Sequence, residues 1–221
     1  MEETIKNLVY IHAFFGGIGL ISGLGSIVVK KGNSAHKKLG KLFTYAMIFS
    51  SLISLIVARM PNHENLFLFL IGIFTIYMVL AGNRALTFKN KAKTKADLLD
   101  KSISGTMFIA SILMIILGIV GMIQKVDNSI LYLFFGAFGT FMTFKDFQTF
   151  KNFRQKKNAW LISHLGRMIG ALIASFTAFL VAGLHIGTTA VWILPTALGT
   201  VYIIYWNRKL KSKKVLKSIK L

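Results

Sequence analysis

The sequence predicts an all-α integral membrane protein with seven transmembrane helices. Of its 221 residues, 54% are hydrophobic and only 15% are charged, and the mean hydropathy is +0.63. A soluble domain carries about 25% charged residues. The apolar residues gather in seven stretches of roughly twenty residues, the length at which a helix crosses about 30 Å of hydrocarbon. A bilayer is therefore the expected solvent of this chain.

The seven predicted segments follow one another with short polar loops between them. They cover residues 8–29, 39–58, 67–88, 103–123, 130–147, 160–183 and 188–206. Because the loops leave no room for a soluble domain, residues 1–207 are expected to form one transmembrane domain, followed by a basic tail at 208–221. The acidic, polar start of the chain lacks the basic stretch and cleavage site of a secretory signal, so the first segment is expected to be retained.

The basic residues predict the orientation of the chain. All 27 Lys and Arg residues lie in or beside the first, third and fifth loops or in the tail, except Lys6, Arg59, Lys125 and Arg167. Since cytoplasmic loops carry an excess of Lys and Arg, the N-terminus is expected outside and the C-terminus in the cytoplasm. The bacterial cytoplasmic (inner) membrane is the expected location.

The same basic residues predict attraction to anionic lipid headgroups, worth about 1 kcal/mol each near the surface. The net charge of +20 does not predict nucleic-acid binding, because the charge lies in short runs between apolar segments. Nucleic-acid binding needs a basic face on a soluble fold. A homo-oligomer is left open.

Similar residue patterns recur in the two halves of the chain and predict a parallel internal repeat. Units 8–88 and 130–207 are expected to match, with 103–123 as a connecting helix. The matching features are Tyr10 and Phe14-Phe15-Gly16 with Tyr132 and Phe134-Phe135-Gly136, His36 with His164, His63 with His185, and Asn83-Arg84 with Asn207-Arg208. Some transporters are built from parallel repeats, with a site near the membrane midplane between the units.

Four histidines are candidate ligands of a metal ion or of haem b. His12 and His185 are expected near the outer surface, and His36 and His164 near the inner one. Neutral imidazole binds zinc, copper or haem iron. However, His164 and His185 are expected at opposite surfaces of the membrane, and no histidines are spaced four residues apart. Histidines bonded to water and lipid headgroups are the plain alternative.

Arg167 is the charge that lies deepest within a predicted segment. Intramembrane charge is costly and usually faces a cavity or a partner, although a long side chain can also reach back toward the headgroups. No Asp or Glu is expected in the core of any segment, so a carboxylate partner for Arg167 and carboxylate proton relays are not expected. An anionic ligand or backbone carbonyls are its expected company, with His164 one helical turn away.

Enzymatic activity is not indicated by the sequence. The chain has no cysteine, so disulfides, thiolate metal sites and cysteine nucleophiles are excluded. No serine–histidine arrangement with recognisable spacing occurs. The hydroxyl side chains of the segments could instead line a polar cavity between the two units; they include Ser50, Ser54, Thr75, Ser175 and Thr200.

Nearly the whole chain resembles a family of uncharacterised bacterial multi-pass membrane proteins defined by a domain of unknown function. The resemblance is carried by Tyr10-Ile-His12-Ala-Phe-Phe-Gly-Gly, His36-Lys-Lys-Leu-Gly-Lys, residues 160–168 and Tyr205-Trp206-Asn207-Arg208. It implies a membrane location and no activity.

The leading functional hypothesis is a permease-like protein that binds a small solute or ligand, with His164, Arg167, Ser175 and Thr200 as its site. A haem- or metal-bearing redox protein is the first alternative, with ligands among His12, His36, His164 and His185. An accessory or scaffold subunit is the second. The substrate, any cofactor, the direction and coupling of transport and the oligomeric state do not follow from the residues.

Overall fold

The structure is a computed structural model that describes residues 2–152, 158–186 and 188–211. It confirms an all-helical chain with seven helices long and apolar enough to cross a membrane. The helices are α1 (Glu2–Val28), α2 (Ser34–Val57), α3 (Leu66–Ala85) with the 3₁₀ turn η1 (Leu86–Lys89), α4 (Leu98–Ile123), α5 (Ser129–Asn152), α6 (Ala159–Ala178) with the π-helical turn η2 (Phe179–Gly183), and α7 (Thr189–Lys211).

Several helices extend beyond the apolar segments because polar residues cap or continue them. The side chain of Asn33 accepts a hydrogen bond from the backbone N–H of His36, so α2 starts five residues before the predicted segment. Asp97 and Asp100 form a capping box that starts α4 at Leu98. Each such cap satisfies backbone N–H groups that the first turn leaves unpaired. Of the predicted tail, residues 208–211 continue α7, and the rest lies outside the described residues.

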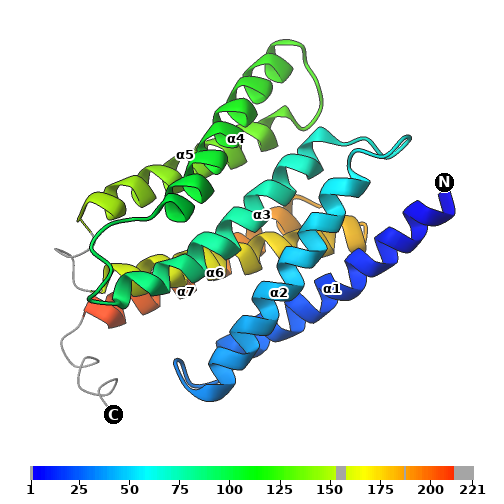
Figure 1. Ribbon diagram of the computed structural model, residues 1–221. Helices are drawn as coiled ribbons and strands as arrows, with labels where there is room; N and C mark the ends of the chain where they lie inside the picture. Colours follow the sequence, from blue (N-terminus) through cyan, green and yellow to red (C-terminus); the bar gives the residue numbers. More distant parts are fainter. Residues whose placement is uncertain (1, 153–157, 187, 212–221) are drawn as a thin grey trace.

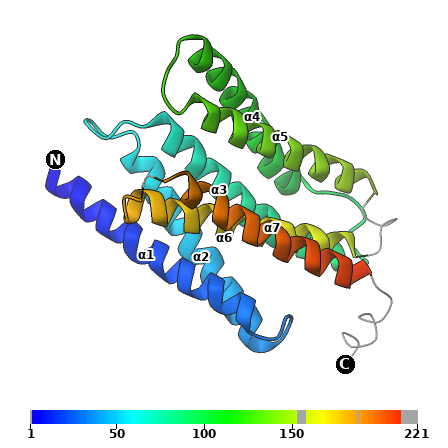
Figure 2. The ribbon, with the colours of Figure 1, turned by 180° about the vertical axis from the view of Figure 1, so that it is seen from behind.

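The bundle has three parts (Figure 1). The hairpin of α4 and α5 lies on one side, the hairpin of α1 and α2 on the other, and α3 and α6 pack together between them. Helix α7 lies over α6, as the opposite view shows (Figure 2). Large buried side chains such as Phe74, Met78, Met107 and Leu172 fill the centre, where α3, α4 and α6 meet.

The two hairpins are held by close backbone contacts at glycines. A Cβ atom on Gly136 would lie 2.9 Å from the backbone N of Ile115 and from the backbone O of Ser111, so α5 approaches α4 too closely for any larger residue. In the other hairpin, Gly19 faces Met47, and Gly23 faces Phe43 and Leu172. Small residues at such positions allow close helix packing within a membrane.

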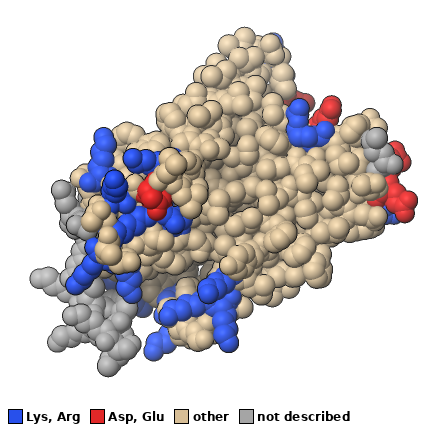
Figure 3. All heavy atoms as spheres, viewed as in Figure 1, with Lys and Arg blue, Asp and Glu red and all other residues tan. Residues whose placement is uncertain are grey.

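Basic side chains of the described residues gather at one end of the bundle (Figure 3). We call this the basic end; it holds the loops 29–33 and 90–97, the start of α6 and the end of α7. The predicted repeat pairs α1 and α2 with α5 and α6. In the structure α1 packs along α2, whereas α5 packs along α4. The repeat stays a prediction from the sequence.

Candidate functional site

A buried ion pair near the basic end joins two helices. The Arg167 guanidinium of α6 donates from Nη2 to Oδ1 of Asp146 on α5, at 2.5 Å. Only 4% of Arg167 and 5% of Asp146 is exposed. Arg167 also donates to the backbone O of Met142 at 2.8 Å and contacts the Met142 sulfur. The expectation that Arg167 lacks a carboxylate partner was therefore wrong, while a backbone carbonyl does accompany it.

The second oxygen of Asp146 collects hydrogen bonds from two further helices. The hydroxyl of Tyr77 on α3 donates to Oδ2 at 2.6 Å, and the hydroxyl of Ser104 on α4 donates to the same atom at 3.0 Å. The guanidinium of Arg167 lies 5.7 Å from the centre of the Tyr77 ring. Four helices thus meet at one carboxylate, and three donors satisfy its charge where little water reaches it.

The sequence did not predict Asp146 as a partner of Arg167, because Asp146 lies near the end of a predicted segment. The predicted segment stopped at residue 147, but α5 continues to Asn152, so Asp146 lies in the interior of the helix. A signal was present in the spacing. The buried face of α5 is formed by residues spaced three or four apart: Gly136, Gly139, Thr143 and Asp146.

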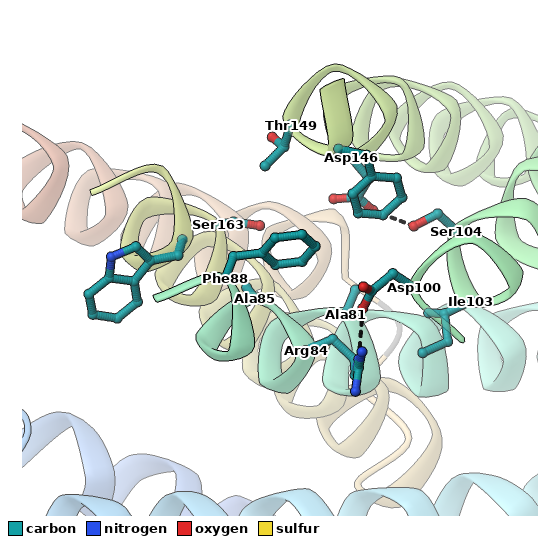
Figure 4. A pocket seen from close by; sticks show the side chains of 12 residues that line it. Ala81, Arg84, Ala85, Phe88, Asp100, Ile103, Ser104, Asp146, Thr149 and Ser163 are labelled. Carbon is teal, nitrogen blue, oxygen red and sulfur yellow. Dashed lines mark hydrogen bonds and ion pairs between the residues drawn. The ribbon is translucent and has the colours of Figure 1, made fainter. Parts of the chain in front are cut away.

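A pocket opens beside this carboxylate toward the basic end (Figure 4). Helices α3 to α6 line it, and its polar lining comes from Arg84, Asp100, Ser104, Asp146, Thr149 and Ser163. The centre of a water molecule finds about 20 Å³ of space there, which is room for about one water. The pocket therefore connects Asp146 with the basic end but is too narrow, in this conformation, for a larger solute.

A cluster of charged side chains lies where the pocket meets the basic end; we call Arg84, Lys93, Asp97 and Asp100 the rim. Nε of Arg84 donates to Asp100 at 2.7 Å, and Lys93 bonds to the same carboxylate at 2.5 Å. Asp97 pairs with Arg84 and with Lys93. The backbone N–H of Asp100, followed by Lys93 and Arg84, holds the pKa of Asp97 below its usual range. The rim fastens η1 and the following loop to the start of α4.

Aromatic rings complete the mouth of the pocket. Phe88 of η1 and Phe150 of α5 stack with 5.9 Å between ring centres, and both line the pocket. The ammonium group of Lys93 lies 4.1 Å from the centre of the Phe88 ring. These side chains would have to part for anything larger than water to enter.

The predicted ligand residues do not all meet at this pocket. Arg167 contributes through Asp146, and His164 donates from Nδ1 to the backbone O of Gly82 at 2.8 Å. Ser175 bonds to the carbonyl of Ala171 on its own helix, and Thr200 is exposed on α7. Neither lines the pocket described above.

The other hydroxyls named from the sequence are engaged within or between helices. Ser54 and Thr75 each bond to a backbone carbonyl of their own helix. Ser50 of α2 bonds to the ring Nδ1 and the backbone O of His12 on α1. These three hydroxyls therefore contribute to helix packing and do not line the pocket.

Two of the four candidate histidines come together. His36 and His164, which the repeat predicts as matching helix starts, lie close enough to interact electrostatically. Nδ1 of His36 lies 3.1 Å from the backbone O of Ser26, and Nδ1 of His164 is bonded to Gly82 O. A carbonyl oxygen only accepts, so both rings carry hydrogen on Nδ1 and direct the Nε2 lone pair elsewhere.

The remaining histidines lie apart from this pair. His12 is bonded to Ser50 on the α1–α2 contact, and His185 is exposed beyond η2. Among the described residues, no three His, Asp or Glu side chains are grouped closely enough to hold a metal ion. An imidazole whose Nδ1 is bonded to a carbonyl can ligate a metal or a haem iron through Nε2.

Comparison with known proteins gives this chain no relative: no family model matches it, and neither does any curated protein or solved structure. Function must therefore be argued from the site itself.

Proposed function

We propose that the protein is a permease-like membrane protein that binds a small polar solute in the pocket beside Asp146. The single observation that carries the proposal is the buried Asp146–Arg167 pair at the inner end of a polar pocket. Ionisable residues within a membrane are costly, and they mark pathways and binding sites more often than packing.

The mouth of the pocket supports this reading. The rim is held by ion pairs, and Phe88 stacks on Phe150. Both kinds of contact can be broken without unfolding a helix. In this proposal the conformation described above is the closed one, and the mouth opens to admit the solute.

The proposed setting is the bacterial cytoplasmic membrane, with the basic end in the cytoplasm. Basic residues of the loops and of the end of α7 are then in contact with anionic headgroups. The resemblance to a family of uncharacterised bacterial membrane proteins agrees with this location and adds no activity.

The absence of cysteine allows a direct test. Ser163→Cys places one thiol in the pocket, Thr94→Cys one in the exposed loop before α4, and Thr106→Cys one on the exposed outer face of α4. In inside-out vesicles, a small charged thiol reagent should label residue 94 quickly and residue 163 more slowly. It should leave residue 106, which faces lipid, unlabelled.

Solutes are then added one at a time from a panel of amino acids, polyols and small carboxylates. The proposal predicts that at least one slows labelling at residue 163 without slowing it at residue 94. Residue 163 as inert as residue 106, or labelling that no solute slows, would overturn the proposal.

A redox role is the second candidate, and the proximity of His36 and His164 favours it. If haem b binds there, His36 and His164 would hold it, and the iron would supply one-electron chemistry. Gently solubilised protein should then absorb as a bis-histidine haem and lose that absorption on His36→Ala or His164→Ala. Colourless protein from haem-supplemented cells would exclude this role.

A further inference from the structure

We propose that Asp146 binds a proton, and that the Arg167 released by this protonation binds a small anion. The inference rests on the proposed function, because it names the solute as an anion and its coupling ion as H⁺. Its test, however, needs no transport.

The pocket gives the proton a route. Asp146 and Ser104 line its inner end, and Thr149 and Ser163 line it further along (Figure 4). A water molecule fits there, and it can transfer a proton to Asp146. In this step a hydronium ion gives H⁺ to the carboxylate, leaving a neutral carboxylic acid and water.

The charged groups around Asp146 determine what its protonation does to the site. Arg167 of α6 is its paired cation, and Tyr77 of α3 donates to it. Lys145 on α5 itself lies instead over the Phe141 ring, 4.3 Å from the ring centre. The other charged groups lining the pocket are Arg84 of α3 and Asp100 of α4, which pair with each other.

The two carboxylates of the pocket therefore differ. Asp100 has two cationic partners, Arg84 and Lys93, and both also reach Asp97. Among the described residues, Asp146 has one cationic partner, Arg167, and that guanidinium bonds to no other carboxylate. Neutralising Asp100 leaves its partners paired with Asp97, whereas neutralising Asp146 leaves Arg167 uncompensated.

An uncompensated guanidinium in a buried site is strongly unfavourable. Nε of Arg167 has no hydrogen-bond partner within the part of the chain that the structure describes, so the side chain has a further donor available. An anion entering through the pocket would restore the balance. The charge is zero with Asp146 ionised and the site empty, and it is zero again with Asp146 protonated and the anion on Arg167. Proton and anion therefore favour each other's binding.

The size of the pocket sets the class of anion. The pocket has space for about one water in this conformation, so its mouth must part even for chloride, nitrate or formate. A bulky anion such as gluconate would need a much wider opening. Guanidinium binds planar oxyanions through two parallel hydrogen bonds, so nitrate and formate should bind Arg167 more tightly than chloride.

Infrared spectroscopy of the purified protein tests both the protonation of Asp146 and the binding of an anion by Arg167. The exposed carboxylates also protonate as the pH falls, so the test follows the additional carboxylic acid band of a buried group. This band should develop in the wild type and in Asp127→Asn, which removes an exposed carboxylate at the opposite end of the bundle. The Asp100→Asn variant should keep the band. The Asp146→Asn variant should lose it, and Asp146→Glu, which retains a carboxylate if the Asn variant does not fold, should shift its frequency.

Because proton and anion binding are coupled, the anion should shift the pH at which Asp146 is protonated. Replacing gluconate by nitrate or formate at equal ionic strength should move the half-developed band upward by about one pH unit. This is a tenfold coupling, within the usual range for coupled sites. A wild type without the band, a band lost in Asp100→Asn but not in Asp146→Asn, or a band equal in gluconate and nitrate would overturn the proposal. The development of the band with pH needs only a proton to enter and no opening of the mouth, so thiol labelling can fail while the titration of Asp146 succeeds. The shift with nitrate or formate does need the mouth to open, and its absence beside solute-protected labelling counts against the anion site alone.

Discussion

Arg167 and Asp146 join α6 to α5, two helices that otherwise pack against different partners. The Nη2–Oδ1 distance is 2.5 Å, while α5 packs along α4, and α6 packs on α3 and α7. The pair, together with the bonds from Arg167 to Met142, therefore forms a polar link between α6 and the α4–α5 hairpin. A role in stability and a role in function have to be separated by experiment.

A double-mutant cycle on this pair should show strong coupling. Asp146→Asn leaves a buried cation and Arg167→Met leaves a buried anion, so each should lower the free energy of unfolding by about 3–5 kcal/mol. The double variant has no buried charge, and its Asn side chain still accepts from Tyr77 and Ser104. Unfolding in mixed detergent micelles should show it more stable than either single variant. Additive losses would show that the two charges do not compensate each other.

Close packing at Gly136 should be indispensable for the α4–α5 hairpin. A methyl group there meets backbone atoms of α4 at 2.9 Å, and backbone cannot swing aside. Gly136→Ala should lower the melting temperature in detergent and weaken the Asp146 site, since Asp146 lies on the same face of α5. Gly105→Ala is the matched control on α4, where nothing lies within 4 Å. That variant should gain up to about 1 kcal/mol from helix propensity, and equal effects of the two changes would contradict the packing.

The rim should weaken in acid because of Asp97. Its pKa is held below the ordinary value of 3.8, chiefly by the backbone N–H of Asp100 and further by Lys93 and Arg84. A lowered pKa in the folded state means that the stabilisation is complete above about pH 4 and is lost as the pH falls through the folded-state value. Half of the Asp97 side chain is exposed, so solvent screening keeps the charge contribution small.

Two substitutions separate the cap from the charge. Asp97→Asn keeps an N-cap acceptor and should lose only the acid dependence, whereas Asp97→Ala should also cost about 0.5–2 kcal/mol for the lost cap. Thermal unfolding in detergent at pH 7 and at low pH measures both. An Asn variant with unchanged acid sensitivity would assign that sensitivity to another group.

The orientation can be tested with single cysteines in this cysteine-free chain. Thr94→Cys at the basic end should react with an impermeant thiol reagent only when the cytoplasmic face is accessible. Asn62→Cys, in the exposed loop between α2 and α3, should react from outside in intact cells. The reverse pattern would place the basic end outside and contradict the charge rule.

The sequence predicted the helices well because each is a long apolar stretch with loops of opposite character. Its limits lie where polar residues decide the outcome. Whether Asp146 belongs to a helix interior depends on how far α5 continues past residue 147, and hydropathy falls there before the helix ends. The pairing of Asp146 with Arg167 depends on how two helices approach, which periodicity along one helix does not encode.

The histidines show the same limit in a different form. The similarity of their surroundings predicts His36 and His164 as equivalent helix starts. Their interaction instead follows from α1, which packs along α2 and also contacts α6. The sequence predicts Ser175 and Thr200 as ligand-binding residues because they are polar residues in apolar segments. In the structure, one satisfies a carbonyl of its own helix and the other is exposed.

Coupled flux in proteoliposomes tests the central claim most directly. Vesicles that contain the protein, a pH-sensitive dye and gluconate are diluted into chloride or nitrate at equal pH and ionic strength. Because a proton and an anion enter together without net charge, the lumen should acidify without any ionophore, should not do so in gluconate, and should stay unchanged with Asp146→Asn. No acidification in the wild type with either anion, or equal acidification in Asp146→Asn, would contradict proton–anion coupling at Asp146 and Arg167.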